Sequence, residues 1–111
     1  MKLLFSAKGG EWDSQLDPRF GRAKGFVLYD TTKNEKSWIS NQENVNASHG
    51  AGVQAAQNVA NLKTKVLITG NMGPKAKATL ENTGIQIFTV DTPCTIREAY
   101  SRYMDDHKEN T

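Results

Sequence analysis

Two glycine-rich segments of this sequence have the composition of an anion-binding site. Gly50-Ala51-Gly52 opens one expected helix, and Gly70-Asn71-Met72-Gly73-Pro74 opens another directly after an expected strand. Helix N-termini carry unpaired N–H groups and a partial positive charge, and glycines let a ligand approach such backbone closely. The alternative for each segment alone is that its glycines only serve a tight turn. Together the segments supply these candidate binding residues: Gly50, Gly52, Gly70, Asn71 and Gly73.

A loop with two arginines offers positive charge for the same anion. The string Asp17-Pro18-Arg19-Phe20-Gly21-Arg22-Ala23 places Arg19 and Arg22 on either side of an aromatic residue and a glycine. A guanidinium group presents a rigid fork of donors that suits oxyanions. We therefore predict that both arginines bind the anion, mainly through charge. In the structural alternative, Asp17 pairs with an arginine while Phe20 fills the core.

A histidine and a cysteine are the remaining candidates for contact with a metal. His49 directly precedes the first glycine segment, where an imidazole can ligate a metal or bind an anion. The alternative is an exposed loop histidine. Cys94 precedes an expected helix start, where thiols tend toward thiolate, but a lone cysteine cannot supply all the ligands of a thiolate-bound cluster. We favour a structural role for Cys94, and we assign no role to His107 in the polar C-terminal stretch.

No catalytic set of residues emerges from the sequence. It contains no HExxH motif, no arrangement that favours a Ser/His/Asp triad, and no carboxylate cluster with the spacing of metal ligands. The sequence therefore favours a binding protein over an enzyme.

Composition narrows the partners and the compartment. The net charge is +2, and no run of lysines or arginines occurs, so we expect no nucleic-acid binding. A single cysteine excludes an intramolecular disulfide and indicates the cytoplasm. The apolar start of the chain, residues 3–5, is too short for a signal peptide or a membrane span.

The order of apolar runs and helix signals predicts one α/β domain, with the boundaries 1–104 and a polar tail at 105–111. Strands are expected at residues 3–5, 26–29, 37–40, 66–69 and 85–90. Helices are expected at residues 52–62, from 74 to just before Gly84, and from 95 onward. The order βββαβαβα combines an antiparallel meander with parallel crossovers, so it predicts a mixed five-stranded sheet covered by helices.

In their order and spacing, these motifs resemble the dinitrogenase iron–molybdenum cofactor biosynthesis proteins. The resemblance covers nearly the whole chain. It rests mainly on Leu16-Asp17-Pro18-Arg19-Phe20-Gly21-Arg22-Ala23, His49-Gly50-Ala51-Gly52, Ile68-Thr69-Gly70-Asn71-Met72-Gly73-Pro74-Lys75-Ala76 and Thr95-Ile96-Arg97-Glu98-Ala99. It implies a three-layer ribonuclease-H-like fold with a mixed sheet in the order 3-2-1-4-5 and helices on both faces. It implies no nuclease activity, because the clustered acidic ligands of such nucleases are not evident here.

The resemblance also implies a function. Similar proteins bind, carry or help assemble iron- or molybdenum-containing sulfur clusters, with cofactor-assembly proteins as partners. Nitrogenase-associated relatives tend to have a histidine just before the Phe-Gly pair, whereas this chain has Arg19. An arginine neutralises the charge of a cluster but does not ligate its metals, which leaves His49 as the better metal-ligand candidate.

Two other functions remain open from the sequence. The same anion-binding residues could serve an enzyme or regulator that binds a phosphate-containing metabolite. Alternatively, the chain could be a protein-interaction module that uses exposed apolar residues such as Trp12 and Trp38.

Overall fold

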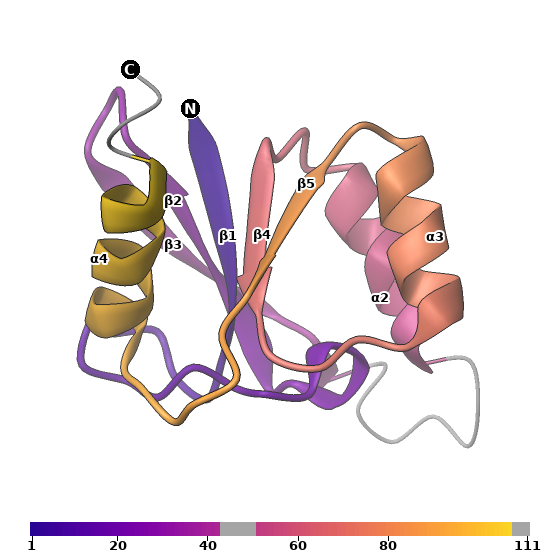
Figure 1. Ribbon diagram of the computed structural model, residues 1–111, viewed down its shortest axis with the longest axis horizontal. Coiled ribbons are helices and arrows are strands. Elements are labelled where there is room, and N and C mark those ends of the chain that lie inside the picture. The colour runs from indigo at the N-terminus through magenta and orange to yellow at the C-terminus, as the bar shows by residue number, and fades with distance from the viewer. Residues whose placement is uncertain (43–50, 108–111) are drawn as a thin grey trace.

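The computed structural model of the chain describes residues 1–42 and 51–107 and is built around a five-stranded sheet in the order β3-β2-β1-β4-β5 (Figure 1). The strands are β1 (Lys2–Ala7), β2 (Gly25–Asp30), β3 (Glu35–Ser40), β4 (Val66–Thr69) and β5 (Gln86–Thr89). The sheet is mixed, as predicted: β1 pairs with β2 and β2 with β3 in antiparallel fashion, whereas β4 is parallel to both β1 and β5. The family resemblance therefore implied the correct strand order.

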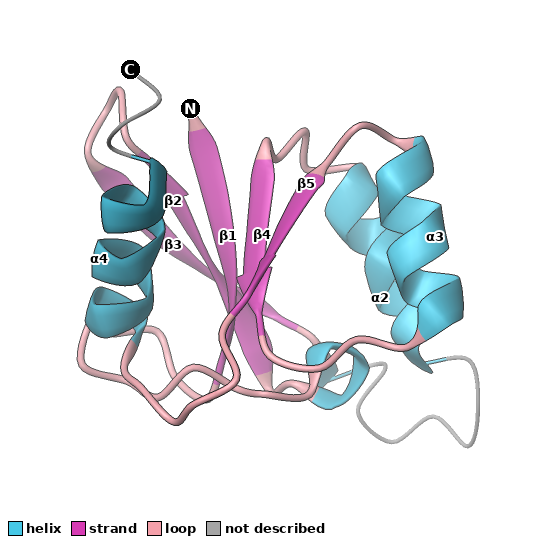
Figure 2. Cartoon of the chain, in the orientation of Figure 1, coloured by secondary structure: helices cyan, strands magenta, loops and turns pink. Residues whose placement is uncertain are grey.

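Helices cover both faces of the sheet and give three layers (Figure 2). One face carries α4 (Ile96–His107), and the other carries α2 (Ala51–Ala60) and α3 (Pro74–Asn82). Because side chains alternate along a strand, β1 contributes to two separate cores: Leu3 and Phe5 pack in the core that includes α4 residues, and Leu4 packs in the core of α2 and α3. Apolar burial on both faces explains why the central strands are continuously apolar.

The helix boundaries follow local signals that were readable in the sequence. Pro74 occupies the first turn of α3, and Gly84, just past its end, has a φ of 84°. At the start of α4, the Thr95 N–H donates to Oε1 of Glu98 at 2.8 Å, and the Glu98 N–H donates to Oγ1 of Thr95 at 3.1 Å. This is the predicted capping box. Because α4 runs to His107, the first residues of the expected polar tail are helical.

Trp12 is not the exposed apolar residue that we expected from the sequence. It is partly buried, with its ring centroid 5.0 Å from that of Tyr29, 5.8 Å from that of Tyr100 and 6.4 Å from that of Phe5. Aromatic side chains from the first loop, β1, β2 and α4 thus shield one another. Trp38 is exposed as expected, at 41%. In the described parts of the chain, no helix is long and apolar enough to cross a membrane.

Candidate functional site

The candidate site lies at the carboxyl ends of β1 and β4. These strands are parallel neighbours, so the loops that follow them emerge at the same edge of the sheet (Figure 1). The loop after β1 contains η1 (Phe20–Arg22), a short 3-10 helix, and the loop after β4 leads into α3. In open α/β sheets, ligands gather at this edge.

The two loops are joined by a short backbone seam. The Asn71 N–H donates to the carbonyl of Pro18 at 2.6 Å, and the Phe20 N–H donates to the carbonyl of Asn71 at 3.3 Å. Gly70 makes this approach possible, because a Cβ at that position would lie 2.5 Å from Cα and 2.7 Å from the carbonyl oxygen of Pro18. Gly70 therefore acts in the site by letting the two loops touch.

A buried hydroxyl pair holds the base of the seam. Ser6 and Thr69 are fully buried at the ends of β1 and β4, and their hydroxyl oxygens are 2.6 Å apart. The Ser6 hydroxyl donates to the carbonyl of Asp17 at 2.6 Å. Since a hydroxyl has one proton, Thr69 must be the donor to Ser6. The chain of hydrogen bonds thus runs from Thr69 through Ser6 to the start of the arginine loop.

Arg19 is the partner of a buried carboxylate. Asp17 is only 1% exposed, and its Oδ1 accepts hydrogen bonds from the backbone N–H of Arg19 at 3.0 Å and from Nε at 3.3 Å. Phe20 is 1% exposed, and its ring centroid lies 5.6 Å from that of Phe26. The structural alternative for Asp17 and Phe20 is therefore confirmed. Arg19 brings donors to this edge while Asp17 balances its charge.

Asn41 fixes the second half of the arginine loop. It is 3% exposed, and its Nδ2 donates to the carbonyl of Ala23 at 2.9 Å and to that of Gly21 at 3.3 Å. Its own N–H donates to the carbonyl of Lys24 at 3.1 Å. Asn41 therefore ties the end of β3 to the turn that positions Arg22.

Five of the predicted site residues surround one open hollow of about 550 Å³. Its lining residues are Arg19, Phe20, Gly21, Arg22, Gly52, Asn71, Met72 and Gly73. Gly70 belongs to the adjoining seam instead. The predicted residues His49 and Gly50 lie outside the described residues.

The start of α3 contributes backbone donors to this hollow. Gly73 is the N-cap residue, no side chain caps the helix there, and a Cβ at Gly73 would meet nothing within 4 Å. The first N–H groups of such a helix have no intrahelical partner, and the helix dipole makes this end positive. Gly52, near the start of α2, packs close to α3, since a Cβ there would lie 3.5 Å from Cβ of Ala76.

The described lining of the hollow includes two arginines and no carboxylate. Among residues 1–42 and 51–107, no group of three or more His, Cys, Asp or Glu side chains is placed to hold a metal. Cys94 is buried in the core beside α4, and burial raises the pKa of its thiol. This burial agrees with the structural role that we favour for Cys94, because desolvation opposes the charged thiolate form.

Sequence reasoning missed four residues that build the site: Ser6, Asn41, Thr69 and Met72. In the sequence, the hydroxyl residues Ser6 and Thr69 each lie at the end of an apolar strand. A single polar residue in such a place indicates only that the strand ends there. A polar side chain that points into an apolar end of a sheet needs a partner, and this was the one available signal. The role of Asn41 depends on loop conformation and had no signal.

Comparisons with known proteins agree with the fold. The family model described as dinitrogenase iron-molybdenum cofactor matches residues 1–106. An uncharacterized protein of Methanocaldococcus jannaschii is 31% identical over 102 residues, which covers 87% of this chain and 83% of that protein.

Two solved structures are similar over nearly the whole chain. The apo form of the orange protein from Desulfovibrio gigas has a TM-score of 0.89 at 38% identity, over 95% of this chain and 88% of that one. A Thermotoga protein with a provisional NifB assignment has a TM-score of 0.80 at 25% identity, over 94% of this chain and 87% of that one.

Proposed function

Because this chain belongs to the dinitrogenase iron-molybdenum cofactor family, we propose that it binds an anionic iron- or molybdenum-containing sulfur cluster as cargo in the hollow beside Arg22 and Gly73. It would carry this cluster or help to assemble it, as a binding protein with no catalytic step of its own. Cofactor-assembly proteins are the partners that such a role requires.

The observation that carries the proposal is the convergence of two kinds of donor, guanidinium groups and backbone N–H groups, on one hollow. Arg19 and Arg22 come from the loop after β1, and the uncapped N-terminus of α3 comes from the loop after β4. Guanidinium groups and backbone N–H groups can surround the acceptor atoms of an anion at little cost, because they are already in place. The seam between the two loops supports this preorganisation.

The chemistry of the lining fits the outer atoms of a cluster. Arginine and backbone donors bind the sulfur or oxygen atoms at the surface of an anion. They do not replace the ligands that its metals already have. Met72 adds a thioether, a soft group, beside these donors. None of the described side chains that line the hollow is a general base at neutral pH, which favours cargo binding over catalysis.

His49 is proposed as a direct metal ligand in addition to these contacts, and a variant pair can test it. We expect His49→Ala to weaken metal binding more than His107→Ala, which removes the other histidine of the chain. Equal metal affinity of the two variants would remove His49 from the proposal.

The decisive experiment is purification without oxygen, followed by metal and sulfide analysis and a visible absorption spectrum. We expect molybdenum or iron together with sulfide, and absorbance that Arg22→Ala diminishes. The matched control is Arg97→Ala, which removes an arginine of α4 whose exposed side chain pairs with Asp13. Protein that stays free of metal and sulfide after incubation with thiomolybdate or an iron–sulfur donor would refute cluster binding.

A parallel measurement with phosphate ligands distinguishes cluster binding from a phosphate-binding role. The same donors can hold a phosphate group. If inorganic phosphate or a nucleotide raised the melting temperature while thiomolybdate did not, the hollow would belong to a phosphate metabolite.

A further inference from the structure

One edge of the sheet is open, and the groove beside it adjoins the hollow described above, since Asn71 and Met72 line both. Within the described residues, β5 is an end strand that pairs only with β4. The Gln86 N–H donates to the carbonyl of Lys65, and the Val90 N–H donates to that of Thr69. Since alternate residues of a strand direct their backbone groups to opposite edges, the N–H and C=O groups of Ile87 and Thr89 point away from the sheet. This edge therefore offers a short row of donors and acceptors for another strand.

The opposite edge of the sheet, β3, has charged residues that discourage pairing with another strand. Its sequence includes Glu35 and Lys36, and Lys36 pairs with Glu11 and donates to the carbonyl of Gly10. Charged edge residues that are tied down discourage pairing with another chain. The run from Ile85 to Val90 is Ile-Gln-Ile-Phe-Thr-Val, which has no charge, no proline and high strand propensity. Of the two edge strands, β5 is therefore the one without charged residues that would discourage pairing.

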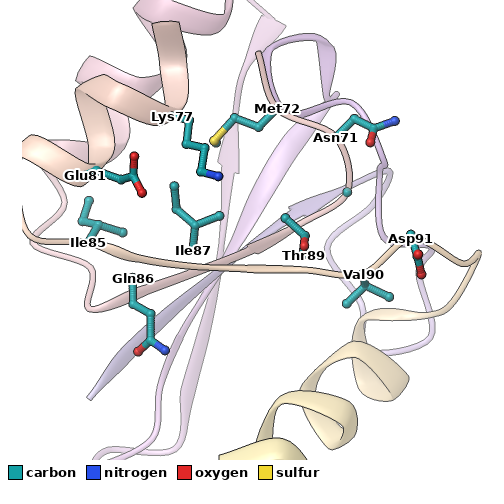
Figure 3. Close-up of a pocket in the computed structure, with 11 residues that line it drawn as sticks. Asn71, Met72, Lys77, Glu81, Ile85, Gln86, Ile87, Thr89, Val90 and Asp91 are labelled. Carbon is teal, nitrogen blue, oxygen red and sulfur yellow. The ribbon is translucent and has the colours of Figure 1, made fainter. Parts of the chain in front are cut away.

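A groove of about 540 Å³ runs along the β5 edge on the side of α3 (Figure 3). Ile85 and Ile87 line its floor, and Lys77 and Glu81 project over it from α3. The two charged residues lie one helical turn apart, and both are exposed. The groove thus has an apolar floor, a charged rim of both signs and a free strand edge beside it.

We propose that β5 and this groove are the interface for a second copy of the chain, with the two β5 strands paired antiparallel across a two-fold axis. Such an axis makes the interface isologous, so each copy presents the same surface. Pairing would satisfy the outward backbone groups of Ile87 and Thr89 and continue the sheet through both copies.

Charge complementarity is the reason to assign a second copy as the occupant. In a two-fold antiparallel arrangement, the order of Lys77 and Glu81 along α3 is reversed in the partner. The positive end of one rim then faces the negative end of the other, so the rim is complementary to itself. This inference rests on residues of β5 and α3 and does not depend on which cargo the hollow binds.

Sedimentation equilibrium of the whole chain over a wide range of concentrations tests the proposal. We expect the average mass to rise from the 12.3 kDa of one chain toward the mass of two. Thr89→Pro should abolish this rise, because proline removes an outward N–H and is tolerated at a sheet edge. The matched control is Ser40→Pro, which makes the same change at an outward position of β3 and should leave association intact.

Exchanging the two charges of the groove rim is a second test of the proposed interface. Lys77→Glu and Glu81→Lys should each weaken association several-fold at low salt, and the double variant, which restores opposite charges, should recover it. Circular dichroism confirms that each variant is folded. A chain that stays monomeric up to about 1 mM, where even weak pairing is populated, would overturn the proposal. So would association that survives Thr89→Pro or is lost in Ser40→Pro.

Discussion

Nε of Arg19 lies 3.3 Å from Oδ1 of Asp17, and the aspartate side chain is 1% exposed whereas the arginine side chain is 64% exposed. A buried carboxylate is thus neutralised by a cation that remains open to solvent. The pair places Arg19 at the rim of the hollow and explains how a charged residue can begin the loop that carries the candidate site.

This ion pair predicts that Arg19 matters for stability. Removing one partner of a buried pair leaves an uncompensated charge, but Arg19 is largely hydrated and its backbone N–H bond to Asp17 would persist. We therefore expect Arg19→Ala to lower the free energy of unfolding by about 1–2 kcal/mol. Urea unfolding measures the loss. The control Arg97→Ala breaks an ion pair exposed on both sides and should cost below about 1 kcal/mol; equal losses would contradict the assignment.

For Arg22 we expect a clear effect on anion binding, because it lines the hollow and is partly open to solvent. Contacts between exposed charges are screened over about 8 Å at physiological salt. Affinity for a thiomolybdate probe should fall as salt rises, and Arg22→Ala should lower it about tenfold at low salt, the equivalent of one charge-assisted hydrogen bond. Titration calorimetry at two salt concentrations is the measurement. Unchanged affinity in the variant at both concentrations would exclude Arg22 from the site.

The hydroxyl pair under the seam should show energetic coupling. Ser6→Ala leaves the carbonyl of Asp17 and the hydroxyl of Thr69 without their partner, so it should cost about 1–3 kcal/mol. Thr69→Val should cost less, because the Ser6 hydroxyl can keep its bond to Asp17. In a double-mutant cycle the two losses should be less than additive. Strict additivity would show that the hydroxyls do not interact in solution.

Two glycines of the same segment should respond differently to substitution. Gly70→Ala forces a Cβ against the backbone of Pro18 and should destabilise the chain by about 1–3 kcal/mol, as overpacked positions do. Gly73→Ala places its Cβ in open space and is the matched control. Melting temperatures of the two variants decide the matter, and a stable Gly70→Ala protein would mean that the seam can open without cost.

The capping box of α4 should give a small acid-dependent loss of stability. The hydrogen bond from the Thr95 N–H lowers the pKa of Glu98 below its ordinary value of 4.5. The stabilisation that ionised Glu98 gives to the folded chain is therefore complete above pH 4.5. It disappears as the pH falls through the lowered pKa that Glu98 has in the folded state. Glu98→Gln cannot ionise, so its melting temperature should approach that of the unmodified chain as acid is added. A constant difference at all pH values would exclude this linkage.

The sequence predicted the fold more completely than the site, for physical reasons. Strand and helix signals such as Pro74, Gly84 and the Thr95–Glu98 pair act through neighbouring residues, so they are readable locally. The roles of the individual site residues, in contrast, depend on contacts between distant parts of the chain. Gly70 and Gly73 are equally permissive in sequence, and only the approach of Pro18 gives one a packing role and leaves the other facing open space.

Exposure was the property that sequence predicted least well. Trp12 sits in a polar stretch and was expected at the surface, but it is covered by aromatic residues that come from distant parts of the chain. For Cys94 the sequence left a reactive thiol near a helix start as the alternative to the favoured structural role, and its depth in the core agrees with the structural role.

The central position of β1 has a consequence for how the chain folds. The meander of β1, β2 and β3 uses only contacts between nearby segments and can form first. Pairing of Leu3 with Val66 then closes a loop of about 60 residues, which is costly in chain entropy. Until the second half of the chain arrives from the ribosome, the apolar edge of β1 remains unpaired. We therefore expect the addition of β4 to be the slow folding step, and the half-finished meander to be the species most prone to aggregation.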